Sequence, residues 1–270
     1  MMNYKNVINI VLKDLLETKN DKGAIASLLI VPFIFSVLLP LIVIIGGSNN
    51  LLVNFIGGIK LFTEQLPSNF LPSNLDNSQT MTYAILMYFF VPLFLLIPVM
   101  ISTIISTSSF TGEKERKTIE GLLYTPITNK ELMLGKILAS FVPSILITWI
   151  SIIVYGTLIN IYSIKELNAF IFPNINWLII SILLAPLITF LSISLVVSIS
   201  HRVKTSKSAQ SISMILILPI IGFLISQASG TLLFGTMVSI ILTITLIIID
   251  IIIYFVISKK FNRDKFITKI

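Results

Sequence analysis

The chain has 270 residues, of which 55% are hydrophobic and 11% are charged, and its mean hydropathy is +0.98. Water-soluble domains carry about 25% charged residues, so this composition excludes a soluble globular protein and indicates an all-α membrane protein. The net charge of +7 could suit a nucleic-acid-binding protein, but the basic residues lie in short segments between apolar runs, so no nucleic-acid partner is expected.

The chain opens with a predicted amphipathic helix over residues 3–19. One face of this helix has apolar side chains at the i, i+3, i+4 spacing, supplied by Tyr4, Val7, Ile8, Val11, Leu12 and Leu15. An amphipathic helix directly before a membrane span is expected to lie in the interface, in contact with membrane lipid. An anchor that only orients the first span is the alternative interpretation.

Six apolar segments are long enough to cross the bilayer, for which a helix needs roughly 20 residues. These spans cover residues 24–45, 81–107, 132–160, 175–200, 209–228 and 232–257. Each is predicted to be helical, because backbone polar groups in lipid must be satisfied within the segment. The last two spans are separated only by residues 229–231, so a re-entrant segment is an alternative there. Together the spans predict a single transmembrane domain over residues 1–270.

The distribution of Lys and Arg predicts the orientation of the spans. All but two of the 19 Lys and Arg residues lie on the side that holds both termini, and the exceptions are Lys60 and Lys165. The positive-inside rule therefore places both termini in the cytoplasm. We expect a multi-pass protein of the cell (plasma) membrane.

A charged segment, Gly112–Glu120, follows the second span on the predicted cytoplasmic side. A small apolar face is supplied by Ile119, Leu122 and Leu123. Pro126 ends the pattern, because the residue before proline avoids helical dihedrals. We predict a short helix over residues 112–124, with a plain charged loop as the alternative. Thr128 and Glu131 form a capping-box pattern that starts the helix of the third span.

Motifs for enzyme chemistry are missing from the sequence. Gly135-Lys136 stands alone without a phosphate-binding loop, the one histidine excludes a histidine-rich zinc site, and the absence of cysteine excludes thiolate chemistry. We therefore expect no catalytic, metal or cofactor site. Asp250 is the only acidic residue within a predicted span, which makes it a candidate functional residue. A structural polar contact is the alternative role for Asp250.

The charged segment carries a resemblance to a known family. The run Gly112–Ile127, with the pattern Glu-Lys-Glu-Arg-Lys-Thr-Ile-Glu followed by Leu-Leu-Tyr-Thr-Pro, resembles permeases of type-2 ATP-binding-cassette (ABC) exporters. The entry segment Leu12–Lys22 and the basic end after the last span are also similar to this family. Lys117 departs from the pattern, since glycine is frequent there in the family, and the departure bears on the local turn.

The resemblance implies that the segment 112–124 is a coupling helix that docks on a separate ATPase subunit, which binds the ATP and Mg. It places at this ATPase interface the residues Glu113, Lys114, Glu115, Arg116, Lys117, Thr118, Ile119, Glu120, Leu122 and Leu123. It further implies a dimer with a second copy or a sister permease, with the transport path between the two chains. The chain itself would be a transport subunit and not an enzyme.

Two other functions remain open on the residues alone. A membrane scaffold without a transport path would use the charged segment only to bind a cytoplasmic protein. An ATP-independent carrier or channel is the third reading, although the spans lack a relay of charged residues. The cargo class is also open between drugs, peptides, lipids, glycoconjugates and sodium.

Overall fold

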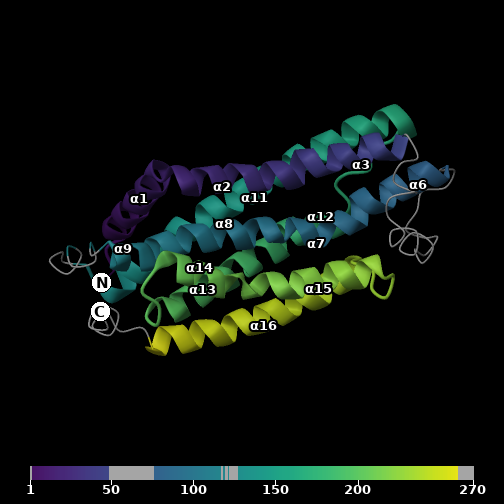
Figure 1. Cartoon of the computed structure of the whole chain (residues 1–270). Coiled ribbons are helices and arrows are strands. Elements are labelled where there is room, and N and C mark those ends of the chain that lie inside the picture. The colour runs from purple at the N-terminus through teal and green to yellow at the C-terminus, as the bar shows by residue number, and fades with distance from the viewer. Residues whose placement is uncertain (1, 49–75, 117, 119–120, 122–126, 261–270) are drawn as a thin grey trace.

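The computed structural model describes residues 2–48, 76–116, 118, 121 and 127–260. Within these residues every regular element is a helix, and the long helices lie side by side in an elongated bundle (Figure 1). The predicted all-α fold is confirmed for this part of the chain. The outer segment 49–75 and several residues of the predicted coupling helix lie outside the described residues.

Within the described residues six helices are long and apolar enough to cross a membrane, as predicted. They are Lys22–Gly46, Ser78–Glu115, Asn129–Leu167, Ile175–Ser200, Ser206–Ala228 and Thr236–Ile257. The last two are separate helices with a short non-helical connection in the described residues. The fourth span has the predicted bounds, whereas the second and third are longer than predicted.

Several spans change helical form along their length. The elements before the third span are α1 (Tyr4–Asn20), α2 (Lys22–Phe33), η1 (Ile34–Leu38), α3 (Leu39–Ser48), α6 (Asn77–Ala84), η3 (Ile85–Phe89), α7 (Phe90–Phe94), α8 (Leu96–Thr107), η4 (Ser108–Gly112) and α9 (Glu113–Glu115). The later elements are α11 (Asn129–Leu167), α12 (Ile175–Ile179), η5 (Ile180–Leu184), α13 (Ala185–Ser200), α14 (Ser206–Ser213), η6 (Met214–Leu216), α15 (Ile217–Ala228) and α16 (Thr236–Lys260). Four of these, η1, η3, η4 and η5, are π-helical turns.

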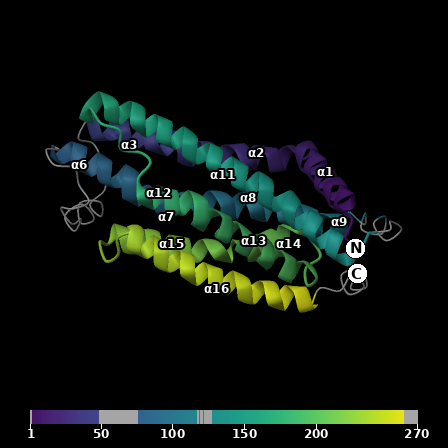
Figure 2. The same cartoon turned by 180° about the vertical axis from the view of Figure 1, so that it is seen from behind.

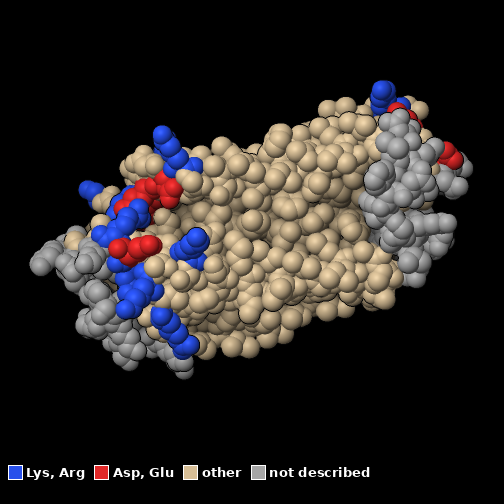
Figure 3. All heavy atoms as spheres, in the orientation of Figure 1, with Lys and Arg blue, Asp and Glu red and all other residues tan. Residues whose placement is uncertain are grey.

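Helix α1, α9, the beginning of α11 and the end of α16 lie at the same end of the bundle, as the two opposite views agree (Figures 1 and 2). We call this the charged end, because most of the Lys and Arg side chains visible in Figure 3 gather there while the long middle of the bundle shows none. An even number of spans returns the chain to the side where it started. The grouping matches the predicted distribution of basic residues.

The second span is the centre of the bundle. In its most apolar stretch 78% of the residues are buried, against 17% for the fifth and sixth spans. Large side chains pack against it from the third and fourth spans: the Tyr155 ring lies 4.6 Å from that of Phe94 and 4.9 Å from that of Trp177, measured between centroids. Aromatic pairs at such distances stabilise beyond the area that they bury.

Carbonyl groups near a proline in this central span accept hydrogen bonds from side chains of other spans. Pro92 has no N–H to donate to the carbonyl of Tyr88, four residues earlier, and the π-helical turn η3 lies just before it. The carbonyls and their donors are Leu86 with the Tyr155 hydroxyl, Met87 with Trp177 Nε1 at 3.0 Å, and Tyr88 with Gln227 Nε2 at 3.0 Å. The donors come from the third, fourth and fifth spans, so this break in span two ties four spans together.

Candidate functional site

Helix α1 packs one face against the start of the third span at the charged end. Its buried residues follow helical spacing: Val7, Ile10, Asp14 and Thr18. A second apolar stripe points away from the bundle, with exposed fractions between 53% and 70%: Tyr4, Ile8, Leu12 and Leu16. The sequence pattern had placed the apolar residues on one face, whereas the structure divides them between the bundle and the outside.

The N-terminus of α1 is attached to the N-terminus of α11 through one carboxylate. Glu131 accepts hydrogen bonds from the backbone N–H of Thr128 at 3.0 Å, from the backbone N–H of Asn3 at 2.6 Å and from Asn6 Nδ2 at 3.2 Å. The Glu131 N–H in turn donates to Thr128 Oγ1 at 3.3 Å, which confirms the predicted capping box. The same residue that starts the third span therefore also holds α1.

A glycine allows α1 and α11 to approach closely. A Cβ atom on Gly135 would lie 2.8 Å from both Cβ and Cγ2 of Ile10, which is too short for a non-bonded contact. We predict that Gly135→Ala costs roughly 1–3 kcal/mol of unfolding free energy, because overpacking displaces the helix backbone. In an Ile10→Ala background the same Gly135→Ala substitution should cost less, because the Ile10 Cγ2 and Cδ1 contacts are then absent. Thermal unfolding of the two single variants and the double variant measures this, and an equal cost of Gly135→Ala in both backgrounds would contradict the contact.

One turn further along, charged side chains from three elements meet in what we call the ion cluster: Lys13, Asp14 and Glu17 of α1, Glu113 of α9 and Lys136 of α11. The Lys136 ammonium lies 2.7 Å from Glu113 Oε2 and 3.7 Å from Asp14 Oδ2, and it donates to the Ser109 carbonyl at 2.6 Å. Lys13 pairs with Glu113, with Asp14 at 3.5 Å and with Glu17 at 3.3 Å. The Ser109 hydroxyl donates to Asp14 Oδ2.

The cluster holds two ammonium groups and three carboxylates, and three of its five side chains are buried. Glu113 is 0% exposed, and Asp14 and Lys136 are each 2% exposed. Burial opposes the charged form of Lys13, but the attraction of Glu113, Asp14 and Glu17 outweighs it and raises the Lys13 pKa. The carboxylates of Asp14, Glu17 and Glu113 come within 4.8 Å of one another, and the Lys13 ammonium contacts all three. A lysine thus supplies the positive charge that this group of acids requires.

The next residues of the charged segment contact two further elements. Glu115 is exposed, and its Oε2 accepts from the backbone N–H of Ser206 at 2.9 Å, at the N-terminus of α14. A carboxylate stabilises a helix N-terminus, because it accepts a hydrogen bond from an otherwise unpaired N–H and lies at the partly positive end of the helix dipole. Arg116 is exposed and lies 3.5 Å from Glu17 Oε2. The charged segment is therefore joined to α1, α11 and α14.

The structure places the predicted interface residues in three groups. Glu113 is buried in the ion cluster, while Lys114 is half-buried and Glu115, Arg116 and Thr118 are exposed. Outside the described residues lie Lys117, Ile119, Glu120, Leu122 and Leu123. The helix of the second span runs on through Glu115, so the predicted start of a separate helix at residue 112 lies inside that span. This continuation is possible because Glu113 is neutralised where it enters the bundle.

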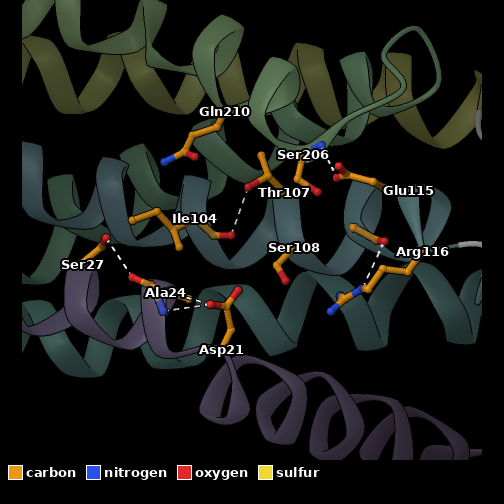
Figure 4. A pocket seen from close by; sticks show the side chains of 12 residues that line it. Asp21, Ala24, Ser27, Ile104, Thr107, Ser108, Glu115, Arg116, Ser206 and Gln210 are labelled. Atoms are coloured by element: carbon orange, nitrogen blue, oxygen red, sulfur yellow. Dashed lines mark hydrogen bonds between the residues drawn. The ribbon is translucent and has the colours of Figure 1, made fainter.

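A pocket of about 480 Å³ opens beside the ion cluster, between the start of α2 and α14 (Figure 4). It is lined by Asp21, Gly23, Ala24, Ser27, Ile104, Thr107, Ser108, Gly112, Glu115, Arg116, Ser206 and Gln210. The Asp21 carboxylate at its edge caps α2, accepting from the N–H of Gly23 at 3.0 Å and of Ala24 at 3.1 Å. The polar groups at this edge are thus engaged in holding helix ends in place. Asp250, the candidate residue within the spans, lies on α16 away from both the pocket and the cluster.

Sequence reasoning missed Lys13, Asp14 and Lys136 as partners of Glu113. Two signals were available: Asp14 interrupts the apolar residues of α1, and Lys136 lies within a predicted span, where a charge requires a partner. Pairing them with Glu113 needed the helix packing, which no local pattern contains.

Comparison with known families agrees with this architecture. Residues 59–229, more than half of the chain, match the model described as ABC-2 family transporter protein. Neither the curated proteins nor the solved structures contain a match to the chain. The match runs from before the second span to the end of α15, and so includes the charged segment, the pocket residues of α8 and α14, and Glu113 and Lys136 of the ion cluster. The chain belongs to the ABC-2 transporter family and is a multi-pass membrane protein, the permease subunit of an ABC transporter.

Proposed function

We propose that this permease forms the transport path of an ATP-driven exporter and is coupled to separate cytoplasmic ATPase subunits through the segment 112–124. The path forms between two permease chains, either two copies of this chain or this chain and a sister permease. The charged end faces the cytoplasm, as the positive-inside rule requires of an end that holds most Lys and Arg residues. The stripe of Tyr4, Ile8, Leu12 and Leu16 lies against lipid in the cytoplasmic interface.

The observation that supports this coupling most is the ion cluster. The segment that receives the ATPase continues directly from the central span, and Glu113 at its start bonds to α1 through Lys13 and to α11 through Lys136. Glu115 adds α14 through the Ser206 N–H. A displacement of the segment would therefore move helix α1 and the second, third and fifth spans together.

The geometry divides the segment into two functions. Glu115, Arg116 and Thr118 are exposed and accessible to a partner, whereas Glu113 is turned inward and is fully buried. We assign docking to residues after 113 and transmission to Glu113. A buried ion pair supports transmission well, because separating its partners is costly and the linked helices are thus held in one arrangement.

We predict that replacing residues 117–123 with a Gly/Ser segment of equal length abolishes substrate-stimulated ATP hydrolysis and ATP-driven export. Thermal stability and membrane insertion should stay those of the wild type, because the ion cluster is left intact. The matched control is the pair Lys165→Ala and Glu166→Ala, which removes two charges at the opposite end of α11. Export by the replaced variant at the wild-type rate would remove this segment from the mechanism.

A further inference from the structure

Asp250 lies on the buried face of the sixth span. That face carries, with exposed fractions of at most 7%, Ser239, Thr243, Asp250 and Ile257. The neighbouring positions on both sides are apolar and exposed, for example Ile249 at 37% and Ile251 at 51%. The Asp250 side chain, exposed by 6%, therefore points into the bundle and away from lipid.

No polar partner faces this carboxyl group in the described part of the chain. Neither carboxylate oxygen of Asp250 has a hydrogen-bond partner there. Helix α16 packs against α12, η5 and α13, and the segment Ile175–Ser200 that forms these elements contains no charged or titratable side chain. The hydroxyls on the same face of α16 are used elsewhere, since Ser239 donates to Asn176 Oδ1 at 2.6 Å and Thr243 to the Ser239 carbonyl at 2.7 Å.

In the described part of the chain no lysine or arginine donates a hydrogen bond to the Asp250 carboxylate. Lys136 is the buried lysine of the bundle's charged end, but its ammonium bonds to Glu113 and the Ser109 carbonyl and lies over the Phe110 ring at 5.6 Å. Phe110 belongs to an apolar cluster with Ile257 of α16. On α16 itself the next charged position is Lys259, about 13 Å further along the helix axis. The fourth-span elements packed against α16 thus bring no charged side chain to Asp250, and its carboxylate oxygens have no hydrogen-bond partner among the described residues.

An isolated carboxylate cannot persist in such a place, because removing its charge from water without a partner costs far more than burying the neutral acid. A metal cation would require several oxygen ligands, and the neighbouring hydroxyls are already engaged. A proton needs neither a cavity nor further ligands. It is the one ligand that this environment accommodates.

We propose that the Asp250 carboxyl group within the sixth span binds a proton. It holds the proton while α16 packs against α13 and releases it when movement of α16 admits water. On release the O–H bond breaks, its electron pair stays on the carboxylate, and water accepts the proton. Moving α16 breaks few contacts within the chain, because only 17% of the residues in the sixth span's apolar stretch are buried, against 56% in the fourth. The protonation of Asp250 is inferred from the geometry alone, whereas release of the proton during transport also rests on the proposed function.

The test is infrared spectroscopy of the purified chain in lipid at neutral pH, with ¹³C-labelled aspartate to identify the signal. We expect a carbonyl-stretch band of a protonated aspartic acid that shifts with the label and is lost in Asp250→Asn. Glu166→Gln, which alters an exposed carboxylate, should leave the band unchanged. Absence of a label-sensitive band in the wild type would overturn the proposal without needing any variant.

A second measurement tests release separately. Difference spectra of the permease with its ATPase, before and after trapping with ATP and vanadate, should lose the Asp250 band and gain a carboxylate band. A band that persists in the trapped complex would overturn release while the site itself stands. Failure to form any ATPase complex would instead count against the proposed function.

Discussion

Glu113→Ala is expected to destabilise the protein by about 3–5 kcal/mol, because it leaves the ammonium of Lys136 buried without its closest carboxylate. Lys13 would lose one carboxylate as well, but it stays partly solvated and keeps Asp14 and Glu17. Since the lost contacts join α1 to the second and third spans, α1 should separate from α11. Denaturant unfolding in detergent measures the stability, and a spin-label distance between α1 and α11 measures the separation.

Two variants make this prediction specific. Glu115→Ala removes the neighbouring exposed carboxylate, and we expect it to cost no more than about 1 kcal/mol, as for other surface charges. Glu113→Leu with Lys136→Met removes one charge of each sign, so the net charge of the cluster is unchanged and most of the stability should return. If Glu113→Ala costs no more than Glu115→Ala, the ion cluster does not hold these helices together.

Trp177→Ala is expected to cost about 3–5 kcal/mol, through loss of a fully packed indole from the centre of the bundle. Trp177 is 1% exposed and donates from Nε1 to the Met87 carbonyl that lies beside the proline break. Trp177→Phe should keep most of the packing but leave that carbonyl unsatisfied, at a cost of about 1–3 kcal/mol. Thermal or denaturant unfolding of the two variants separates packing from hydrogen bonding.

The chain provides its own control, because it has only two tryptophans. Trp149 also donates from Nε1 to a carbonyl, that of Ser181 at 2.8 Å, but its side chain is 41% exposed. Trp149→Phe should therefore have a much smaller effect on stability than Trp177→Phe. Equal effects of the two substitutions would show that the buried hydrogen bond to the Met87 carbonyl contributes no more than the exposed one to Ser181.

The spans were predictable because their signal is local. A run of about 20 apolar residues decides whether a helix crosses the bilayer, and the fourth span was found at its observed bounds, Ile175–Ser200. The capping box of Thr128 and Glu131 is also local, and both of its hydrogen bonds are present. By contrast, the second span was predicted to end at Thr107 and its helix continues to Glu115. Its charged end is compatible with a helix entering the bundle only because of Lys13 and Lys136, which are distant in sequence.

The sequence predicted where the candidate site lies, but it predicted the roles of the residues in the site only partly. The motif located the charged segment, yet spacing alone treated Glu113 and Glu115 as equivalent. One proves fully buried and the other exposed, because the last turn of the second-span helix carries them on different sides. Which of the two glutamates points inward depends on how α1 and α14 pack against the segment, and the residues that decide this packing lie elsewhere in the chain. Asp250 could be singled out from sequence as a lone acid in a span, but only the structure shows that its carboxylate has no hydrogen-bond partner among the described residues.

The most direct test of the account is a cross-link between the charged segment and an ATPase subunit in native membranes. The chain has no cysteine, and Gly121 is exposed with nothing within 4 Å of an added Cβ, so Gly121→Cys gives one defined attachment site. Asn168→Cys, at the far end of α11, is the matched control. We predict that a short bifunctional cross-linker joins Gly121→Cys to an ABC-type ATPase, one per permease, and that Asn168→Cys yields no such product. If Gly121→Cys is labelled in the membrane but captures no ATPase, coupling through this segment is contradicted.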